Sequence, residues 1–270
     1  MTVRKVHFYV NDTKPEAKAL RPELAARLSG LGLAETEAEC ADVIVALGGD
    51  GTILRAVRDY PLKPVLGFNL GGLGFLSSVE RKDFDAALHL LAAGRFRLSK
   101  RTVLTVRKAG SPDAAQVALN DVVIVREMTG RAACLDLSVD SHAATRYLAD
   151  GLVIATPTGS TAYSLSAGGP VLMPDAGGLV VTPMNPHALG VRPMVVPDTV
   201  SLSVVSRPRE EDRTGTLGVY ADGVQVFLLA SGEAAELSKA AQDATFVELE
   251  GYDPYEVLAR KLGWRGSNVP

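Results

Sequence analysis

Apolar residues in the first hundred positions of the chain follow two alternating patterns. Short, continuous apolar runs predict buried parallel strands at residues 3–10, 41–47 and 63–69. Apolar residues at helical spacing predict helices at residues 14–31, 52–60 and 83–96. Pro15 suits the first turn of the first helix, and Asp83 is placed to cap the third. This order of strands and helices predicts a parallel sheet with helices on both faces.

Beyond about residue 101 the apolar runs become shorter, alternate with polar residues and are separated by turn residues. This texture is typical of antiparallel strands, which we expect at residues 103–107, 117–126, 135–139, 152–155, 200–205, 217–220 and 225–229. Residues 158–167 can open a helix, and residues 254–262 show helical spacing again. We therefore expect an α/β domain of residues 1–100, with residues 251–270 packing back onto it, and a mostly-β domain of residues 101–250.

Composition narrows the classes of protein that remain. The chain is 47% hydrophobic and 22% charged, and its net charge of -3 argues against a general nucleic-acid binder. Cys40 and Cys134 have no partner at metal-ligand spacing, so we expect reduced packing residues in a reducing compartment. No apolar stretch reaches the roughly 18 residues that a membrane-spanning helix needs, and charges interrupt the N-terminal run. We expect a cytoplasmic protein without a membrane partner.

A glycine-rich turn with one acid lies between a predicted buried strand and a predicted helix, and it consists of Gly48, Gly49, Asp50, Gly51 and Thr52. Ligands of open α/β sheets bind at the carboxyl ends of strands, where glycines let the backbone approach a phosphate. Asp50 could then hold Mg²⁺ or accept a proton from an attacking hydroxyl, or it could simply cap the helix. The turn matches neither the Walker A loop nor the dinucleotide glycine pattern, which argues against a hydride-transferring enzyme.

A second motif is rich in hydroxyl groups and follows Asp150, Gly151 and a short predicted strand, over residues 156–166. Its hydroxyls can bind ribose, phosphate and base edges, and the ring of Tyr163 offers a flat face for a purine. Asp150 could pair with an amide or an exocyclic amine of the ligand. The alternative is a loop of Ser and Thr turns with a helix cap.

Three weaker signals accompany these motifs. Asn120 and Asp121 lie near a strand start and favour either a turn or a ligand contact. His187 is a candidate base or ligand, although a lone histidine is more often a packing or capping residue. Asp222 with Gly223 predicts a hairpin turn first and a ligand contact second.

Together these motifs resemble one family, the NAD kinases. The match comprises residues 48–52, 69–76, 119–121, 150–151, 156–170, 186–189 and 192–193, within a resemblance that covers about residues 40–260. The glycine–aspartate turn alone is shared with phosphofructokinases and with diacylglycerol and sphingosine kinases. The run at residues 157–163 is far more specific to NAD kinases.

The resemblance implies a Rossmann-like N-terminal domain for the phosphoryl donor and a β-rich C-terminal domain for NAD, with NAD bound between them. It implies that Asp50 is the essential acidic residue, whose carboxylate accepts the proton of the 2′-hydroxyl of the adenosine ribose. The donor phosphates would lie against Gly48, Gly49, Gly51 and Thr52. The implied NAD contacts are Asp50, Gly51, Arg55, Asn120, Asp121, Asp150, Thr158, Thr161, Ala162, Tyr163, Ser164, Leu165 and Ser166.

The same resemblance implies a donor and an assembly. ATP or polyphosphate would supply the phosphoryl group, and Mg²⁺ would enter through the donor phosphates without an assigned protein ligand. Family members are usually homodimers or homotetramers in which a neighbouring subunit partly completes the site. The donor, the choice between NAD and NADH, the number of subunits and feedback by NADPH stay open.

This chain departs from the family pattern at three places. Leu148 stands where the family often has Arg, and Asp121 stands where it often has the longer Glu. Val224 separates Gly223 from Gln225, so the role of Gln225 stays open, as does that of His187. Two other functions remain as alternatives, namely a lipid kinase of the diacylglycerol or sphingosine type and a sensor that binds NAD(P) without turnover.

Overall fold

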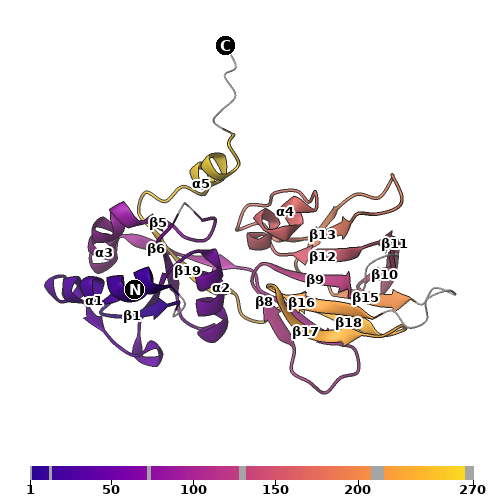
Figure 1. Ribbon diagram of the computed structural model, residues 1–270, viewed down its shortest axis with the longest axis horizontal. Helices are drawn as coiled ribbons and strands as arrows, with labels where there is room; N and C mark the ends of the chain where they lie inside the picture. Colours follow the sequence, from indigo (N-terminus) through magenta and orange to yellow (C-terminus); the bar gives the residue numbers. More distant parts are fainter. Residues whose placement is uncertain (1, 12–13, 72–73, 128–131, 208–215, 265–270) are drawn as a thin grey trace, which may run out of the picture. The chain divides into compact units, whose positions relative to one another are not determined.

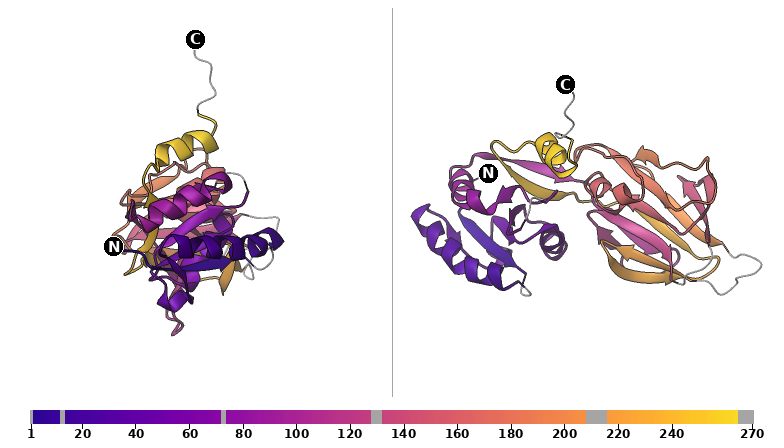
Figure 2. Two further views of the ribbon diagram at one scale, coloured as in Figure 1. Left: turned by 90° about the vertical axis from the view of Figure 1, so that its left-hand side faces the viewer. Right: turned by 45° about the horizontal axis from the view of Figure 1, so that its top comes forward.

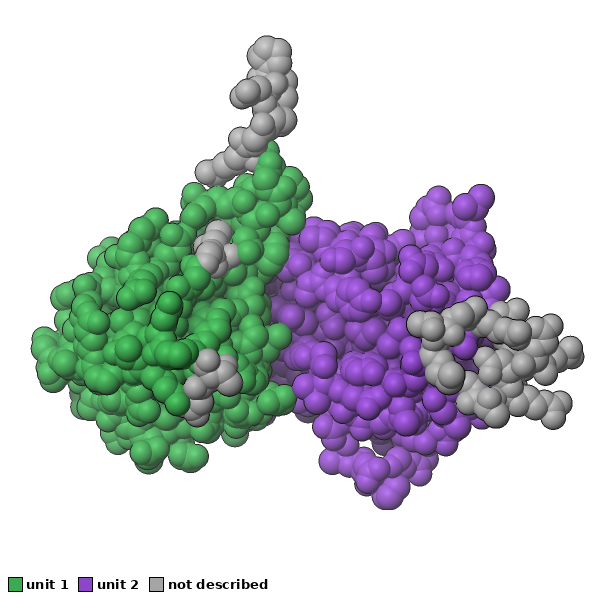
Figure 3. Space-filling model, viewed as in Figure 1, with its two compact units in different colours: residues 1–100, 244–270 green, residues 101–243 purple. Residues whose placement is uncertain are grey.

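The computed structural model describes residues 2–11, 14–71, 74–127, 132–207 and 216–264 of the 270-residue chain. The chain divides into two compact units, of which the first comprises residues 1–100 and 244–270 and the second residues 101–243 (Figures 1 and 3). Helices and the main parallel sheet belong to the first unit, and antiparallel strands dominate the second. The expected fold class is confirmed.

A seven-stranded sheet forms the centre of the first unit, with the order β2-β1-β3-β4-β19-β6 and with β5 paired to β4 (Figure 1). The neighbours from β1 to β19 in this order pair in parallel. The strands are β1 (Lys5–Val10), β2 (Ala34–Glu35), β3 (Val43–Leu47), β4 (Val65–Asn69), β5 (Val79–Glu80), β6 (Phe96–Arg101) and β19 (Ala244–Leu249).

Helices cover both faces of this sheet, as its pattern of apolar runs predicts (Figure 2). The helices are α1 (Pro15–Gly30), α2 (Asp50–Asp59), α3 (Phe84–Ala92) and α5 (Pro254–Lys261). Helices α1 and α3 share one core with alternate residues of β3 and β4, and Phe68 stacks on Phe84 at 4.4 Å between ring centroids. Helix α2 lies on the other face, where the side chain of Ile53 abuts Gly67. Alternation along each strand therefore supplies both layers of the core.

Two six-stranded antiparallel sheets form the second unit, with the orders β11-β10-β15-β18-β7-β8 and β14-β13-β12-β9-β16-β17. Their inner faces share one core, to which Leu135 and Leu237 contribute from the first sheet and Ile124 and Ile154 from the second. The strands are β7 (Leu104–Lys108), β8 (Gln116–Ala118), β9 (Asp121–Arg126), β10 (Ala133–Val139), β11 (His142–Ala149), β12 (Gly151–Ala155), β13 (Gly178–Met184), β14 (Met194–Pro197), β15 (Leu202–Arg207), β16 (Leu217–Ala221), β17 (Val224–Leu229) and β18 (Ala234–Lys239).

Several elements differ from the sequence-based expectation. The strand expected over residues 117–126 is divided into β8 and β9, and the sequence did not predict the strand that follows residue 240. That strand, β19, was assigned to the β-rich domain, but it pairs in parallel with β4 and belongs to the first unit. All six of its residues are buried, so it shows no alternation that would reveal a strand.

Asp83 occupies the N-cap position of α3, as expected, but its side chain makes no capping hydrogen bond. Asp83 ends the preceding 3₁₀ turn (Arg81–Asp83), and its backbone, with φ -105° and ψ 4°, lacks the extended conformation that is typical of a capping residue. Cys40 and Cys134 are both free thiols, and Cys40 is exposed rather than packed. Among the described residues, no helix is long and apolar enough to span a membrane.

Leu24 provides a test of the first core. Its side chain on α1 has no exposed surface, so we expect Leu24→Ala to lower the free energy of unfolding by about 2–5 kcal/mol. Leu62→Ala is the matched control, because Leu62 is 68% exposed and its truncation should cost less than about 0.5 kcal/mol. Urea unfolding followed by circular dichroism measures both, and equal midpoints for the two variants would contradict this core.

Candidate active site

The glycine turn lies at the carboxyl end of β3. Gly49 is the N-cap of α2, and Asp50 is in the first helical turn. Strand β4 lies directly beside β3 in parallel, with Leu47 opposite Phe68. The loops that follow the two strands therefore leave the sheet at the same edge, and this brings Asp50 to the loop after β4.

The carboxylate of Asp50 accepts hydrogen bonds from three consecutive backbone N–H groups. Phe75 donates to Oδ2 at 2.8 Å, and Leu76 and Ser77 donate to Oδ1 at 3.1 and 3.3 Å. Hydrogen bonds to a charged acceptor are stronger than those between neutral groups. Asp50 thus holds the loop after β4, while Oδ2 accepts one bond from the described residues and keeps a lone pair for a ligand.

Hydrogen bonds of the buried Asn69 and Ser77 side chains also hold the loop after β4. The Ser77 hydroxyl accepts hydrogen bonds from Asn69 Nδ2 at 2.8 Å and from the Gly74 N–H at 3.1 Å. The Asn69 Oδ1 accepts the N–H of Gly71 at 2.9 Å. A Cβ atom at Gly74 would overlap Asp50 Oδ1 and the Ser77 hydroxyl, so only glycine lets the loop approach the carboxylate this closely. Gly72 and Leu73 of this turn lie outside the described residues.

The C-terminal helix α5 is tied to the same loop. Lys261 Nζ lies 5.3 Å from the ring centroid of Phe75, and Arg260 pairs with Glu80 at 2.7 Å. The Arg260 guanidinium holds the pKa of the Glu80 carboxyl below its usual value. Asp253 caps the helix by accepting the N–H groups of its first turn. The expected return of the C-terminal helix is therefore present in the first unit, with residues 265–270 outside the described part.

The other predicted residues of this loop differ in their exposure, and Gly48 is buried. Gly51 is exposed, while Gly49 and Arg55 are half-buried. Arg55 Nε donates to the Gly51 carbonyl at 3.4 Å, which holds its guanidinium along the first turn of α2. Thr52 is buried beneath the turn.

In the second unit, Asn120 and Asp121 lie at the start of β9. The Asp222 carboxylate accepts the N–H groups of Leu119 and Asn120, both at 2.8 Å, and of Asp121 at 3.2 Å. These bonds explain why β8 and β9 are separate, because the N–H groups between the strands are bound to a side chain. Asp222 and Gly223 form the expected hairpin turn, with φ values of 47° and 78°.

The hydroxyl-rich segment folds into a 3₁₀ turn (Thr158–Thr161) and a short helix, α4 (Tyr163–Ser166), after β12. The Thr156 hydroxyl donates to the Leu119 carbonyl at 2.5 Å, and the Ser164 hydroxyl pairs with that of Thr182 at 2.8 Å. A Cβ atom at Gly159 would overlap the Asn120 carbonyl, which places the segment directly against Asn120. The hydroxyl-rich segment and residues 120–121 therefore form one cluster.

Within this cluster a buried polar group lacks a hydrogen-bond partner among the described residues, and some side chains are exposed. The Thr158 hydroxyl is buried and has no hydrogen-bond partner among the described residues. The side chain of Tyr163 is 43% exposed, and Ser166 is exposed as well. Thr161 donates to the Thr158 carbonyl at 3.2 Å, and Ala162 and Leu165 are half-buried.

Asp121 is only 6% exposed. Its carboxylate accepts the N–H of Tyr163 at the start of α4. Burial, together with the negative charge of Asp222, raises the pKa of Asp121 to about 7, although the Tyr163 N–H opposes this rise. Asp121 therefore supports α4 and is a titrating group near neutral pH.

Asp150 does not join this cluster. It precedes β12, whereas residues 156–166 follow the strand, and five residues of strand span roughly 17 Å. Asp150 is exposed and accepts a hydrogen bond from Asn185 Nδ2 at 2.8 Å. His187 lies at this end too, exposed, with its N–H on the Leu148 carbonyl at 2.9 Å.

Gln225 lies in a third place. Its Nε2 donates to Glu127 Oε1 at 2.8 Å, and the Tyr220 hydroxyl donates to the same oxygen at 2.8 Å. The hydrogen bond from the Tyr220 hydroxyl to Glu127 is the main cause that raises the pKa of Tyr220 above its usual value. Gln225 therefore has a structural partner in Glu127, the residue that follows β9.

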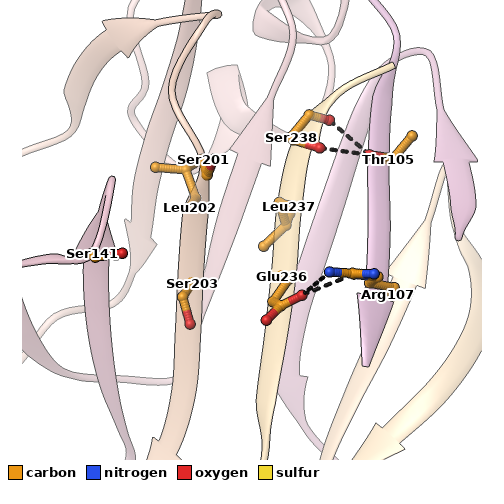
Figure 4. A pocket seen from close by; sticks show the side chains of 9 residues that line it. All are labelled: Thr105, Arg107, Ser141, Ser201, Leu202, Ser203, Glu236, Leu237 and Ser238. Atoms are coloured by element: carbon orange, nitrogen blue, oxygen red, sulfur yellow. Dashed lines mark hydrogen bonds and ion pairs between the residues drawn. The ribbon is translucent and has the colours of Figure 1, made fainter. Parts of the chain in front are cut away.

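A cavity of about 370 Å³ lies on the outer face of the sheet that contains β7, β15 and β18 (Figure 4). Arg107 pairs with Glu236 across it, and Thr105 donates to the Ser238 carbonyl. The lining residues are Thr105, Arg107, Ser141, Ser201, Leu202, Ser203, Glu236, Leu237 and Ser238. None of them is a sequence-predicted site residue, so this cavity is separate from both motif clusters.

Sequence reasoning assigned no role to Asn69 and Ser77, and it treated Asp222 chiefly as a turn residue. Each of these side chains fixes the backbone beside a predicted site residue. A polar residue at the end of a buried strand is the signal that marks Asn69. The partner of Asp222 is about a hundred residues away in the chain, so no local pattern reveals it.

A glycine loop at the carboxyl edge of a parallel sheet and a β-sandwich unit with a hydroxyl-rich cluster place the chain among two-domain nucleotide-dependent kinases. Family models agree. Residues 12–96 match the ATP-NAD kinase N-terminal domain, and residues 119–249 match the ATP-NAD kinase C-terminal domain. The chain belongs to the NAD kinase family.

Individual proteins support this assignment. The chain is 42% identical over 254 residues to the NAD kinase of Symbiobacterium thermophilum, covering 91% of this chain and 88% of that protein. It is 40% identical over 227 residues to the NAD kinase of Syntrophotalea carbinolica, covering 83% and 78%.

Solved structures show the same architecture. A yeast NADH kinase complexed with NADH superposes with a TM-score of 0.85 at 25% identity, covering 99% of this chain and 89% of that chain. An NAD kinase from Archaeoglobus fulgidus in complex with ATP superposes with a TM-score of 0.74 at 26% identity, covering 96% and 97%. The chain is accordingly a transferase of the kinase type that uses NAD and ATP.

Gly74 tests the approach of the loop to Asp50. We expect Gly74→Ala to displace the carboxylate and to lower turnover in an NADP-formation assay by at least about tenfold, because small displacements of reacting groups reduce rates strongly. Gly71→Ala is the matched control, since the nearest atom to its Cβ would be Asn69 Oδ1 at 3.8 Å. Normal turnover in Gly74→Ala would show that the close approach is dispensable.

Proposed function

We propose that this protein transfers the γ-phosphoryl group of ATP to the 2′-hydroxyl of the adenosine ribose of NAD, giving NADP and ADP. The observation that carries this proposal is the Asp50 carboxylate, fixed by three backbone N–H groups at the carboxyl edge of the parallel sheet. The family assignment supports the identity of both substrates.

Asp50 acts on the attacking hydroxyl in this proposal. The 2′-hydroxyl donates to Oδ2, and its oxygen attacks the γ-phosphorus in line as the bond to ADP breaks. The hydroxyl proton passes to the carboxylate. Because Oδ1 is occupied by two N–H groups, Oδ2 is the oxygen that is free to orient the hydroxyl. Positioning and charge stabilisation then account for most of the rate.

The donor phosphates lie against the backbone of Gly48, Gly49, Gly51 and Thr52 in this proposal, at the N-terminus of α2. Mg²⁺ often reaches kinase sites through substrate phosphates and one or two carboxylates, and it keeps several waters. Asp50 fits a water-mediated contact better than a direct one, because three N–H groups already occupy its carboxylate. The ion would offset the charge of the phosphates.

NAD is held by the cluster of the second unit in this proposal. Asn120 and the unpartnered Thr158 hydroxyl supply polar contacts, and the exposed ring of Tyr163 supplies a stacking face. The remaining predicted contacts of this cluster shape the pocket around the dinucleotide, and they are Thr161, Ala162, Ser164, Leu165 and Ser166. Arg55, on α2, is a further predicted contact, and its guanidinium suits a phosphate. Asp121 contributes by holding α4.

We also propose a homodimer or homotetramer. Asp150 lies at the opposite end of β12 from the hydroxyl-rich segment, so within one copy it is far from Asn120. A contact between Asp150 and NAD would then involve the site of a second copy. The net charge of -3 supports the absence of a nucleic-acid partner, and the two free thiols are consistent with a reducing cytoplasm.

Asp50→Asn tests the catalytic assignment. The substitution places an amide NH₂ opposite a backbone N–H donor, and it removes the negative charge that orients the hydroxyl. We therefore expect kcat to fall by about a hundredfold or more. The affinity for NAD, measured by calorimetry, should change by less than about threefold. Asp59→Asn on the same helix is the control, because Asp59 pairs with Tyr9. Near-normal kcat in Asp50→Asn would refute the role of Asp50.

Removal of the metal provides a separate test. Excess EDTA should abolish NADP formation, and Mg²⁺ added beyond the chelator should restore it, because the charge of the donor phosphates needs an offsetting cation. Calorimetric binding of NAD alone should be insensitive to EDTA. Full turnover in EDTA would contradict the proposed role of the metal.

A further inference from the structure

Asp222 occupies the tip of the hairpin between β16 and β17. Its φ of 47° lies in the left-handed region, and Gly223 follows at 78°. From there its carboxylate accepts the N–H groups of Leu119, Asn120 and Asp121 at 2.8, 2.8 and 3.2 Å. The N–H of Asp222 donates in return to the Asp121 carbonyl at 3.0 Å. A hairpin tip and a strand start that are far apart in the chain are thus joined by four hydrogen bonds.

The opposite side of this segment is held as well. The Thr156 hydroxyl donates to the Leu119 carbonyl at 2.5 Å, and the Thr156 N–H donates to the Asn120 carbonyl at 2.9 Å. Gly159 lies against the Asn120 carbonyl with no room for a Cβ atom. Both the N–H donors and the carbonyl acceptors of residues 119–121 are therefore hydrogen-bonded. The backbone from which their side chains project is held in one position.

The carboxylate of Asp222 lies close enough to that of Asp121 for their like charges to repel each other. A residue that served only to form the hairpin turn would not need this unfavourable contact. Asp121 is buried beside Asp222, and burial together with this like charge raises the pKa of Asp121 to about 7. Asp222 is the charged side chain that faces Asp121 among the described residues, and the Tyr163 N–H faces it from α4. Two carboxylates at one place destabilise each other unless each binds donors, and here both bind backbone N–H groups.

We infer that Asp222 is a positioning residue of the NAD site, whose carboxylate fixes the backbone of residues 119–121 so that Asn120 meets the dinucleotide and Asp121 holds the start of α4. The inference rests on the proposed binding of NAD by this cluster. Asp222 acts through the segment that it holds. Its loss therefore weakens NAD binding and leaves the chemical step at Asp50 intact.

Kinetics of Asp222→Ala test this inference. Removing the acceptor leaves three N–H groups unpaired, and we expect KM for NAD to rise by about tenfold or more while kcat and KM for ATP change by less than about threefold. Asp222→Asn keeps one acceptor oxygen and should lie between Asp222→Ala and the wild type. Unchanged KM for NAD in Asp222→Ala would overturn the inference.

Asp140→Asn is the matched control. Asp140 is also a hairpin residue with positive φ, at 46°, and its Oδ1 accepts the N–H of Ser201 at 2.8 Å. It contacts no residue of the NAD cluster in these bonds, so its replacement should leave KM for NAD unchanged. An equal rise of KM in Asp140→Asn and Asp222→Asn would assign the effect to general loss of stability and overturn the inference.

Calorimetric titration with NAD at several pH values separates positioning from mere folding. Protonation of Asp121 weakens its hold on the Tyr163 N–H, so we expect NAD affinity to fall in a step as the pH drops through the pKa of Asp121. Loss of the like charge in Asp222→Asn lowers this pKa, so the step should move to lower pH. An unmoved step, or its absence from the wild type, would contradict the coupling of Asp222 to Asp121. If the wild type binds NAD but forms no NADP, the kinase proposal fails while this titration still tests Asp222.

Discussion

A carboxylate that accepts consecutive backbone N–H groups is the interaction on which both candidate site clusters of this protein depend. Asp50 accepts the N–H groups of residues 75–77, and Asp222 accepts those of residues 119–121. Residues 75–77 follow β4 and residues 119–121 lie before and at the first residue of β9, where regular strand pairing does not supply every N–H group with a partner. The carboxylate supplies that partner and fixes the loop in one conformation.

The sheet topology decides which residues can meet in this way. Strands β3 and β4 are parallel neighbours, so the turn after one lies beside the loop after the other. Gly74 permits the final approach, and Asn69 and Ser77 hold the loop from within the buried layer. The same carboxylate that organises the backbone keeps one oxygen for a ligand hydroxyl. In the proposed mechanism, catalytic orientation and local stability are thereby coupled in Asp50, so a substitution there is expected to affect both.

The sequence predicted the parallel core of the first unit because its strands are continuous apolar runs beside glycine turns. It also predicted the glycine turn and the hydroxyl-rich segment as site elements, since their residue types are unusual for plain loops. Strand β18 was missed because Ala, Glu, Ser and Lys have little intrinsic preference for strands. It is a strand because β7 and β15 pair with it on its two sides. The hydrogen bonds of the Asp50 and Asp222 carboxylates could not be predicted, because each set joins residues that only the fold brings together.

Backbone amide exchange at residues 75–77, followed by nuclear magnetic resonance in the wild type and in Asp50→Ala, directly tests the hydrogen bonds that these residues donate to the Asp50 carboxylate. The account predicts slow exchange in the wild type and much faster exchange of these three N–H groups in the variant, with residues 119–121 unchanged. Equal exchange rates at residues 75–77 in the two proteins would show that the Asp50 carboxylate does not hold this loop, and would contradict the central claim.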